Sequence, residues 1–123
     1  MRRATIIAAC VSAFLVSMTA APAFAGYGAV AFDEKTAKYG FGWNEDTQKR
    51  ADEAALQACN SEACKVVFAV PPRRCAALAT GEKGTAWGGR VDATRDGAKL
   101  RAIEDCQKHT SGKCVIRGSD CNR

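Results

Sequence analysis

The sequence is poor in the groups that carry most enzyme chemistry. It contains one histidine, His109, and three serines after residue 25. A Ser-His-Asp triad therefore has few starting points, and neither the Gly-x-Ser-x-Gly elbow nor a Gly-x4-Gly-Lys-Ser/Thr phosphate loop is present. His109 lies in a polar segment with nothing at metal-ligand spacing, so we expect a solvated loop histidine, no metal and no cofactor. The serines are Ser61, Ser111 and Ser119.

Strong net charge is also lacking. The chain carries 18 basic and 13 acidic residues, a net charge of +5. Residues 1–25 hold Arg2 and Arg3 and no acidic residue, so 16 basic and 13 acidic residues follow, a net charge of +3. A general nucleic-acid-binding domain usually carries more positive charge, and no nucleic acid partner is expected.

Residues 1–25 have the pattern of a secretory signal peptide. Arg2 and Arg3 precede an uncharged run over 4–21, and Ala23-Phe24-Ala25 is a small-x-small cleavage site. We expect a mature protein that begins at Gly26, is secreted or periplasmic, and has no membrane span. An uncleaved membrane anchor is the alternative, because an 18-residue uncharged run is of borderline length for spanning.

Six cysteines follow the signal peptide. An even number in a small exported domain indicates three disulfides, which are useful in a domain of 98 residues with a modest core. A structural metal site is the alternative, but the spacings are Cys-x4-Cys and Cys-x7-Cys instead of paired Cys-x2-Cys. The six are Cys59, Cys64, Cys75, Cys106, Cys114 and Cys121.

An internal repeat organises the chain. Thr47, Ala51, Ala55 and Cys59 recur 47 residues later as Thr94, Ala98, Ala102 and Cys106. The spacing of four predicts two helices, each with a threonine cap and a small-residue stripe that lies close to a sheet.

Strand patterns surround each predicted helix. The first repeat (27–70) has them at 28–32, 37–43 and 65–70, and the second (75–121) at 75–79, 85–91 and 115–117. We therefore predict a single α+β domain over 26–123, in which two strand-strand-helix-strand repeats form one antiparallel sheet with two helices packed on it.

The second strand of the first repeat alternates aromatic residues with glycine. Tyr39, Phe41 and Trp43 share one face, and two glycines on the other face predict close approach of another backbone, the alanine-striped helix. Trp87 matches Tyr39 only with an offset of 48 instead of 47, which predicts a β-bulge in one copy.

Repeat symmetry also predicts the disulfide pairing. Cys59–Cys64 and Cys106–Cys114 would each tie a helix end to the next strand, which leaves Cys75–Cys121. The principal alternative joins Cys59 to Cys106 across the repeats.

Charge is divided unevenly between the halves of the mature chain. Residues 26–70 carry a net charge of −2 and residues 71–123 a net charge of +5. Arg90, Arg95 and Lys99 are the candidate binding patch, although Arg101 lies about 240° around the helix from Arg95 and faces elsewhere. Ordinary solvated surface is the alternative. Carboxylates that could serve glycosidic hydrolysis by proximity are Asp92 with Asp96 and Glu104 with Asp105.

The chain contains four motifs that together form a recognisable set. They are Tyr-Gly-Ala-Val-Ala-Phe at 27–32, Ala-x3-Ala-x3-Cys in the predicted helices, Cys-Lys-Val-Val at 64–67 and Cys-Ala-Ala-Leu-Ala at 75–79. Over residues 27–121 the chain resembles the DUF4189 family of small exported bacterial domains. The resemblance implies export and a duplicated α+β arrangement, with no catalytic residues to carry over.

These patterns together predict a non-enzymatic binding module. Its partner would be another exported protein or an anionic envelope polymer, and the chain would be a monomer. The alternatives are an envelope hydrolase that uses carboxylates and a structural or stress-related exported protein without a specific ligand.

Overall fold

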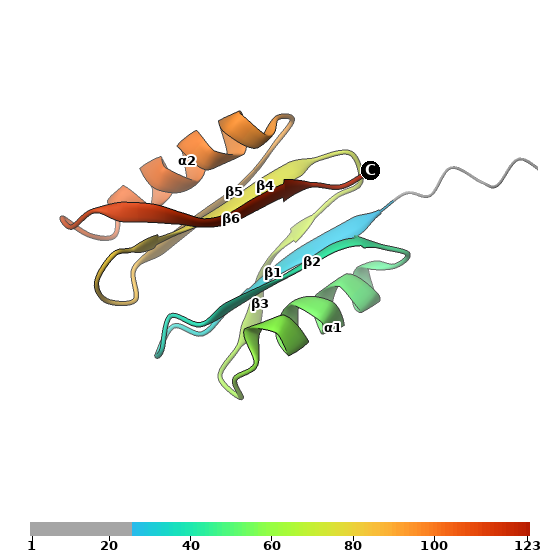
Figure 1. Cartoon of the computed structure of the whole chain (residues 1–123), viewed down its shortest axis with the longest axis horizontal. Coiled ribbons are helices and arrows are strands. Elements are labelled where there is room, and N and C mark those ends of the chain that lie inside the picture. The colour runs from blue at the N-terminus through green and yellow to red at the C-terminus, as the bar shows by residue number, and fades with distance from the viewer. Residues whose placement is uncertain (1–25) are drawn as a thin grey trace, which may run out of the picture.

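The computed structural model describes residues 26–123, and the predicted signal peptide lies outside them. Residues 26–123 form six strands and two helices, and each of the two predicted repeats contains the order strand, strand, helix, strand (Figure 1). The first repeat consists of β1 (Tyr27–Phe32), β2 (Tyr39–Glu45), α1 (Gln48–Cys59) and β3 (Lys65–Val70). The second repeat consists of β4 (Cys75–Gly81), β5 (Trp87–Asp92), α2 (Arg95–Gln107) and β6 (Cys114–Cys121).

Both helices begin where the repeated threonines predict. The side chain of Thr47 accepts a hydrogen bond from the Arg50 amide at 3.1 Å, and that of Thr94 accepts one from the Gly97 amide at 3.0 Å. Each cap satisfies a backbone N–H that the first helical turn leaves free. The predicted stripe is the buried face of each helix: Ala51, Ala55 and Cys59 in α1, and Ala98, Ala102 and Cys106 in α2.

The helices lie against glycines of the second strand of each repeat. A Cβ atom on Gly40 would collide with the backbone of Ala55 and Cys59, and one on Gly88 would collide with the backbone of Ala102 and Cys106. The prediction that the glycine face of the β2 strand touches the helix is therefore confirmed. Only a residue without a side chain lets helix and strand approach this closely.

The prediction of one sheet is wrong, because each repeat forms its own three-stranded antiparallel sheet. The strand orders are β2-β1-β3 and β5-β4-β6, and no strand pairs across the repeats within residues 26–123. The two sheets pack face to face with a helix on each outer side, which gives four layers in the order α1, sheet, sheet, α2 (Figure 1). The reason lies in the central strands β1 and β4, which are apolar on both faces and so need cover on both.

The layer between the sheets interlocks aromatic rings with glycines. Val30 in β1 pairs with Phe41 and Phe68, while its counterpart Leu78 in β4 pairs with Gly89 and Gly118. The ring of Phe68 lies against Gly89, and the ring of Phe41 lies against Gly118. Two phenylalanines of the first repeat thus occupy the space left by glycines at the equivalent positions of the second.

A β-bulge in β2 explains the change of offset between the repeats. Ala29 pairs with Gly42 and Tyr27 pairs with Glu45, so β2 holds one residue more than β1 in this interval. The extra residue is at Asn44, whose φ of 54° is left-handed, and β5 has no corresponding irregularity. The predicted bulge is therefore confirmed. Because the first repeat holds one residue more at the bulge, equivalent positions of the two repeats are 48 residues apart in the strands before it and 47 apart in the helices after it.

Two kinds of contact complete the framework. The disulfides are Cys59–Cys64, Cys106–Cys114 and Cys75–Cys121, which is the predicted pairing, and all three lie within a repeat. The repeats are joined by packing and by Asn122, which is 6% exposed. Its side chain accepts a hydrogen bond from the Asn44 amide at 3.0 Å and donates one to the Val70 carbonyl at 2.9 Å.

The interlocking predicts a specific cost of enlarging the glycines. Gly89→Ala and Gly118→Ala should each lower the free energy of unfolding by about 1–3 kcal/mol, because the new methyl group meets a phenylalanine ring in a packed layer. Equilibrium unfolding in urea measures this. Gly112→Ala is the matched control, since the nearest atom to its new Cβ lies at 3.4 Å. If Gly118→Ala were as stable as Gly112→Ala, the sheets would not interlock as described.

Candidate functional site

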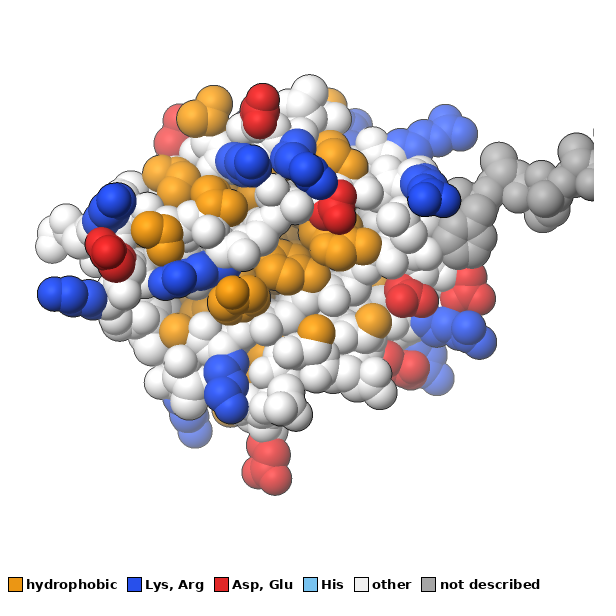
Figure 2. All heavy atoms as spheres, viewed as in Figure 1, with side chains coloured by type: hydrophobic (Ala, Val, Ile, Leu, Met, Phe, Trp, Pro, Cys, Tyr) orange, Lys and Arg blue, Asp and Glu red, His pale blue; other side chains and the backbone are white. Residues whose placement is uncertain are grey.

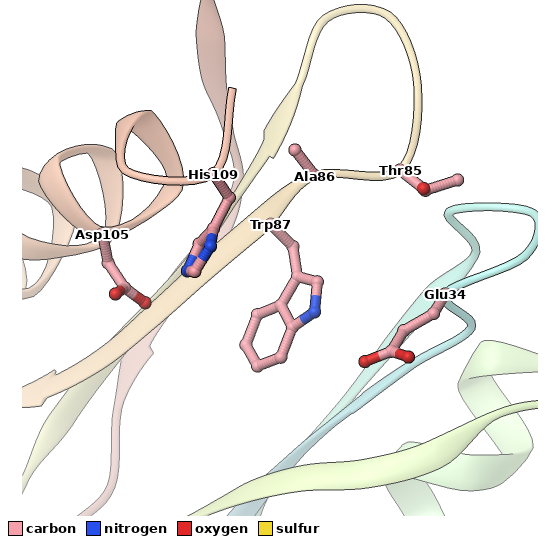
Figure 3. A pocket seen from close by; sticks show the side chains of 6 residues that line it. All are labelled: Glu34, Thr85, Ala86, Trp87, Asp105 and His109. Carbon is pink, nitrogen blue, oxygen red and sulfur yellow. The ribbon is translucent and has the colours of Figure 1, made fainter. Parts of the chain in front are cut away.

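An open hollow of about 550 Å³ lies at the junction of the two repeats (Figure 3). One wall comes from the turn after β1, a second from the turn before β5 and the start of that strand, and a third from the C-terminal end of α2. Its walls therefore combine segments that are up to 75 residues apart in the sequence, between Glu34 and His109. The lining residues are Glu34, Thr85, Ala86, Trp87, Asp105 and His109.

Trp87 supplies the aromatic surface of the hollow. Its ring centroid lies 5.6 Å from that of Phe32 at a tilt of 40°, and Phe32 is fully buried. The indole is half-buried, and Figure 3 shows it between Glu34 on one side and Asp105 with His109 on the other. Packing against a fixed phenylalanine holds the indole in place.

Asp105 is engaged by a neighbouring arginine. Both of its oxygens accept hydrogen bonds from the guanidinium of Arg90, at 3.0 and 3.2 Å, and one oxygen also accepts from the Gly89 amide at 3.2 Å. A bidentate arginine–carboxylate pair is geometrically specific. The Asp105 side chain is 15% exposed, and its role in this structure is to tie α2 to β5.

Of the other candidate carboxylates, Asp92 also has a local role. Asp92 accepts a hydrogen bond from the Thr94 amide at 3.1 Å and pairs with Arg101 at 3.1 Å. Asp96 and Glu104 are exposed on α2. No observation places two of these carboxylates on either side of a cleft, which is the arrangement that glycosidic hydrolysis uses.

His109 is exposed, as the sequence predicts, and its amide closes α2 by donating to the Cys106 carbonyl at 2.9 Å. Its place beside Trp87 was not predicted. The convergence of Glu34, Trp87 and His109 depends on how the repeats pack, and the sequence contains no signal for it except the aromatic character of Trp87.

A second feature is a row of aromatic side chains on the edge strand β2. The rings of Tyr39 and Phe41 lie 5.8 Å apart edge to face, and those of Phe41 and Trp43 are stacked with centroids 5.9 Å apart. Tyr39 is 37% exposed. Phe41 and Trp43 are half-buried, because they pack against the layer between the sheets and only their outer parts reach the surface. In Figure 2 hydrophobic side chains form a band across the middle of this face, with Lys and Arg side chains and several Asp or Glu side chains around it.

The candidate basic patch is divided by the fold. Arg90 lies on β5 and Arg95 pairs with Asp120 of β6 at 2.7 Å, and β5 and β6 are opposite edges of one sheet. Lys99 follows Arg95 by one helical turn and shares its side of α2. The structure thus brings Arg95 and Lys99 together and separates them from Arg90. Arg101 pairs with Asp92 at the β5 side, so its predicted orientation away from Arg95 is confirmed.

Arg117 joins the same edge as Arg95. It is exposed on β6, next to the Gly118 that holds the ring of Phe41, and its Nε donates to the Thr80 hydroxyl at 2.7 Å. We call this surface the β2–β6 face, defined by one aromatic row and three cations. Its residues are Tyr39, Phe41, Trp43, Arg95, Lys99 and Arg117.

Asp33 is the most perturbed acid among the described residues, and its role is structural. Its carboxylate accepts hydrogen bonds from the Ser61 hydroxyl at 2.7 Å, the Thr36 hydroxyl at 2.7 Å and the Lys35 amide at 2.8 Å. These donors favour the charged form and lower the pKa of Asp33 from 3.8 to about 2. The carboxylate joins the turn after β1 to the turn after α1.

A pH dependence follows from this lowered pKa. The contribution of the Asp33 carboxylate to stability is fully present above its usual pKa near 3.8 and is lost as the pH falls towards about 2. Asp33→Asn should therefore be less stable than the parent at about pH 6, and the difference should shrink by about pH 2.5. Urea unfolding at both pH values measures it, with the exposed Glu53→Gln as control. A difference that stayed constant with pH would show that the charge of Asp33 is not what stabilises these turns.

None of the helices in residues 26–123 is long and apolar enough to cross a membrane. In the same residues, no cluster of three or more His, Cys, Asp or Glu side chains could hold a metal ion.

Comparison with known proteins identifies the family. The family described as "Domain of unknown function (DUF4189)" matches residues 27–121. The chain is therefore a member of the DUF4189 family, as its motifs indicated. It is also similar to the NMR structure of Rv1813c from Mycobacterium tuberculosis, with 25% sequence identity, a TM-score of 0.57 and coverage of 99% of both chains. No curated protein matches the sequence significantly.

Proposed function

We propose that this protein is an exported, non-enzymatic binding module that holds an anionic envelope polymer along the β2–β6 face. The observation that carries the proposal is the aromatic row of Tyr39, Phe41 and Trp43 on an unpaired edge strand. Partly exposed aromatic rings that gather on one surface mark interaction sites in soluble proteins.

The geometry of the row suits an extended ligand. The ring centroids are 5.8 and 5.9 Å apart, so the three rings follow the strand for at most about 12 Å. Such a row matches a chain of repeating units better than a single small molecule. Sugar rings present a C–H face that packs on aromatic rings, which makes a glycan-containing polymer a suitable occupant.

The charges beside the row favour an anionic polymer. Arg117 and Lys99 have no acidic partner among the ion pairs of residues 26–123, while Arg95 is half-exposed and shares its charge with Asp120. Each neutralised anionic group releases counterions from the polymer, so this part of the binding should depend on salt.

The disulfides favour a binding surface that is already ordered before the ligand binds. Three disulfides support an oxidising compartment outside the cytoplasm, and they fix the helices and the second sheet. A surface that is already ordered loses little conformational entropy when it binds.

The test compares substitutions at the two edges of the second sheet. Lys99→Gln with Arg117→Gln should weaken binding to a soluble anionic polysaccharide by at least about fivefold at 50 mM salt, and the effect should fade by about 200 mM. Arg90→Gln with Arg101→Gln is the matched control, because it also removes two positive charges, from the β5 edge on the opposite side. Sedimentation with purified cell envelope and titration with polygalacturonate measure the binding, with neutral dextran as the reference polymer.

The aromatic contribution is tested separately. Tyr39→Ser should weaken binding to the same polymer at every salt concentration, since ring contact does not depend on counterions. Urea unfolding confirms that the fold is retained. Parent protein that binds neither envelope nor polygalacturonate contradicts the proposal, and so does equal weakening by the control variant Arg90→Gln with Arg101→Gln. Capture of one exported protein that depends on Tyr39 would instead assign the face to a protein partner.

A further inference from the structure

We propose a second binding site in the Trp87 hollow, specific for the ammonium group of a small organic cation. The proposal does not depend on the β2–β6 face, because the hollow lies at the junction of the turn after β1 with β5 and α2. Its volume of about 550 Å³ is in the range of small-ligand sites.

The lining of the hollow contains two carboxylates and no lysine or arginine. Glu34 and Asp105 line it, while the cations that pair with them, Lys65 and Arg90, do not. An anionic ligand would therefore meet two carboxylates, whereas a cationic one would be attracted.

The carboxylates of Asp105 and Glu34 differ in how freely they can pair with a ligand cation. Asp105 is held by both ends of the Arg90 guanidinium and by the Gly89 amide. Glu34 is 3.7 Å from Lys65, and both side chains are more than half exposed, at 54% and 65%. An exposed pair at this distance contributes little, so a ligand cation can replace Lys65 as the partner of Glu34.

Trp87 supplies the second requirement for ammonium binding. Tryptophan is the aromatic residue that attracts cations most strongly, through the negative face of its ring system. Phe32 holds the indole in position, and Figure 3 shows the Glu34 carboxylate on the side of the indole that faces away from α2. A cation over the indole would lie between an aromatic face and a carboxylate.

The remaining lining residues set the size and polarity of the ligand. Thr85 offers a hydroxyl, Ala86 a methyl group and His109 an imidazole at the rim. These groups suit a compact amino alcohol with a methylated or primary ammonium group. The open form of the hollow leaves one side of the ligand in water, so we expect dissociation constants in the millimolar range.

The experiment uses the two tryptophans of the chain as paired reporters. Choline is titrated into the mature protein, and the indole N–H signals of Trp87 and Trp43 are followed by NMR. The Trp87 signal should shift saturably while that of Trp43, on the β2–β6 face, stays unchanged. The uncharged isostere 3,3-dimethyl-1-butanol should shift the Trp87 signal at least about fivefold less at equal concentration, because it lacks the cation–π term.

Substitutions assign the contacts. Glu34→Gln should weaken choline binding by about two- to fivefold, the effect expected for one partly exposed counter-charge. Glu82→Gln, an exposed acid of the β4–β5 turn that does not line the hollow, is the matched control and should leave binding unchanged. Trp87→Leu removes the reporter signal, so choline binding to this variant is followed by saturation transfer from the protein to the choline methyl protons. The transfer seen with the parent protein should be lost, and urea unfolding checks that the variant still folds.

A vesicle assay distinguishes the two sources from which the cation could come. Sedimentation with phosphatidylcholine vesicles, in addition to the choline shift, would identify a lipid headgroup as the source of the cation, and a choline shift without sedimentation would identify a free solute. An equal response to the uncharged isostere, a shift of Trp43 alone, or no effect of Glu34→Gln would overturn the proposal.

Discussion

The contact between the two sheets is the constraint on which the rest of the structure depends. Each repeat builds a sheet whose central strand is apolar on both faces, and its own helix covers only one of them. The other face has to be covered by the second repeat. Phe41 against Gly118 and Phe68 against Gly89 make this contact complementary, because large residues in one sheet face small residues in the other. Two identical copies of the first repeat would place phenylalanine against phenylalanine at both positions.

The sequence predicts the parts of this fold that are local. Thr47 and Thr94 cap helices because a cap needs only the next three residues, and the two short disulfides follow from cysteines at equivalent helix ends. The number of sheets cannot be predicted from local patterns, because it depends on how the two repeats pack. The run over 76–79 is apolar at every position, which signals burial on both faces, yet the alternation in the β2 strand is compatible with a single sheet that is open to water on its aromatic side.

The candidate sites could be predicted only in part, for the same reason. Helical geometry alone placed Arg101 away from Arg95, because both residues belong to one helix. The separation of Arg90 from Arg95 depends on the strand order of the second sheet, and the approach of Glu34 to Trp87 depends on how the two repeats pack. No pattern within one repeat contains that information.

Divergence of the repeats explains why the molecule has two different candidate surfaces. The positions of Tyr39, Phe41 and Trp43 in the first repeat correspond to Trp87, Gly89 and Val91 in the second. Gly89 is required where Phe68 packs, so an unbroken aromatic row cannot form on β5. What remains there is a single indole beside a hollow, while β2 keeps three rings in a row. The same packing that joins the sheets therefore leaves an extended surface at one edge and an isolated aromatic site at the other, which we propose as the sites for a polymer and for a small cation.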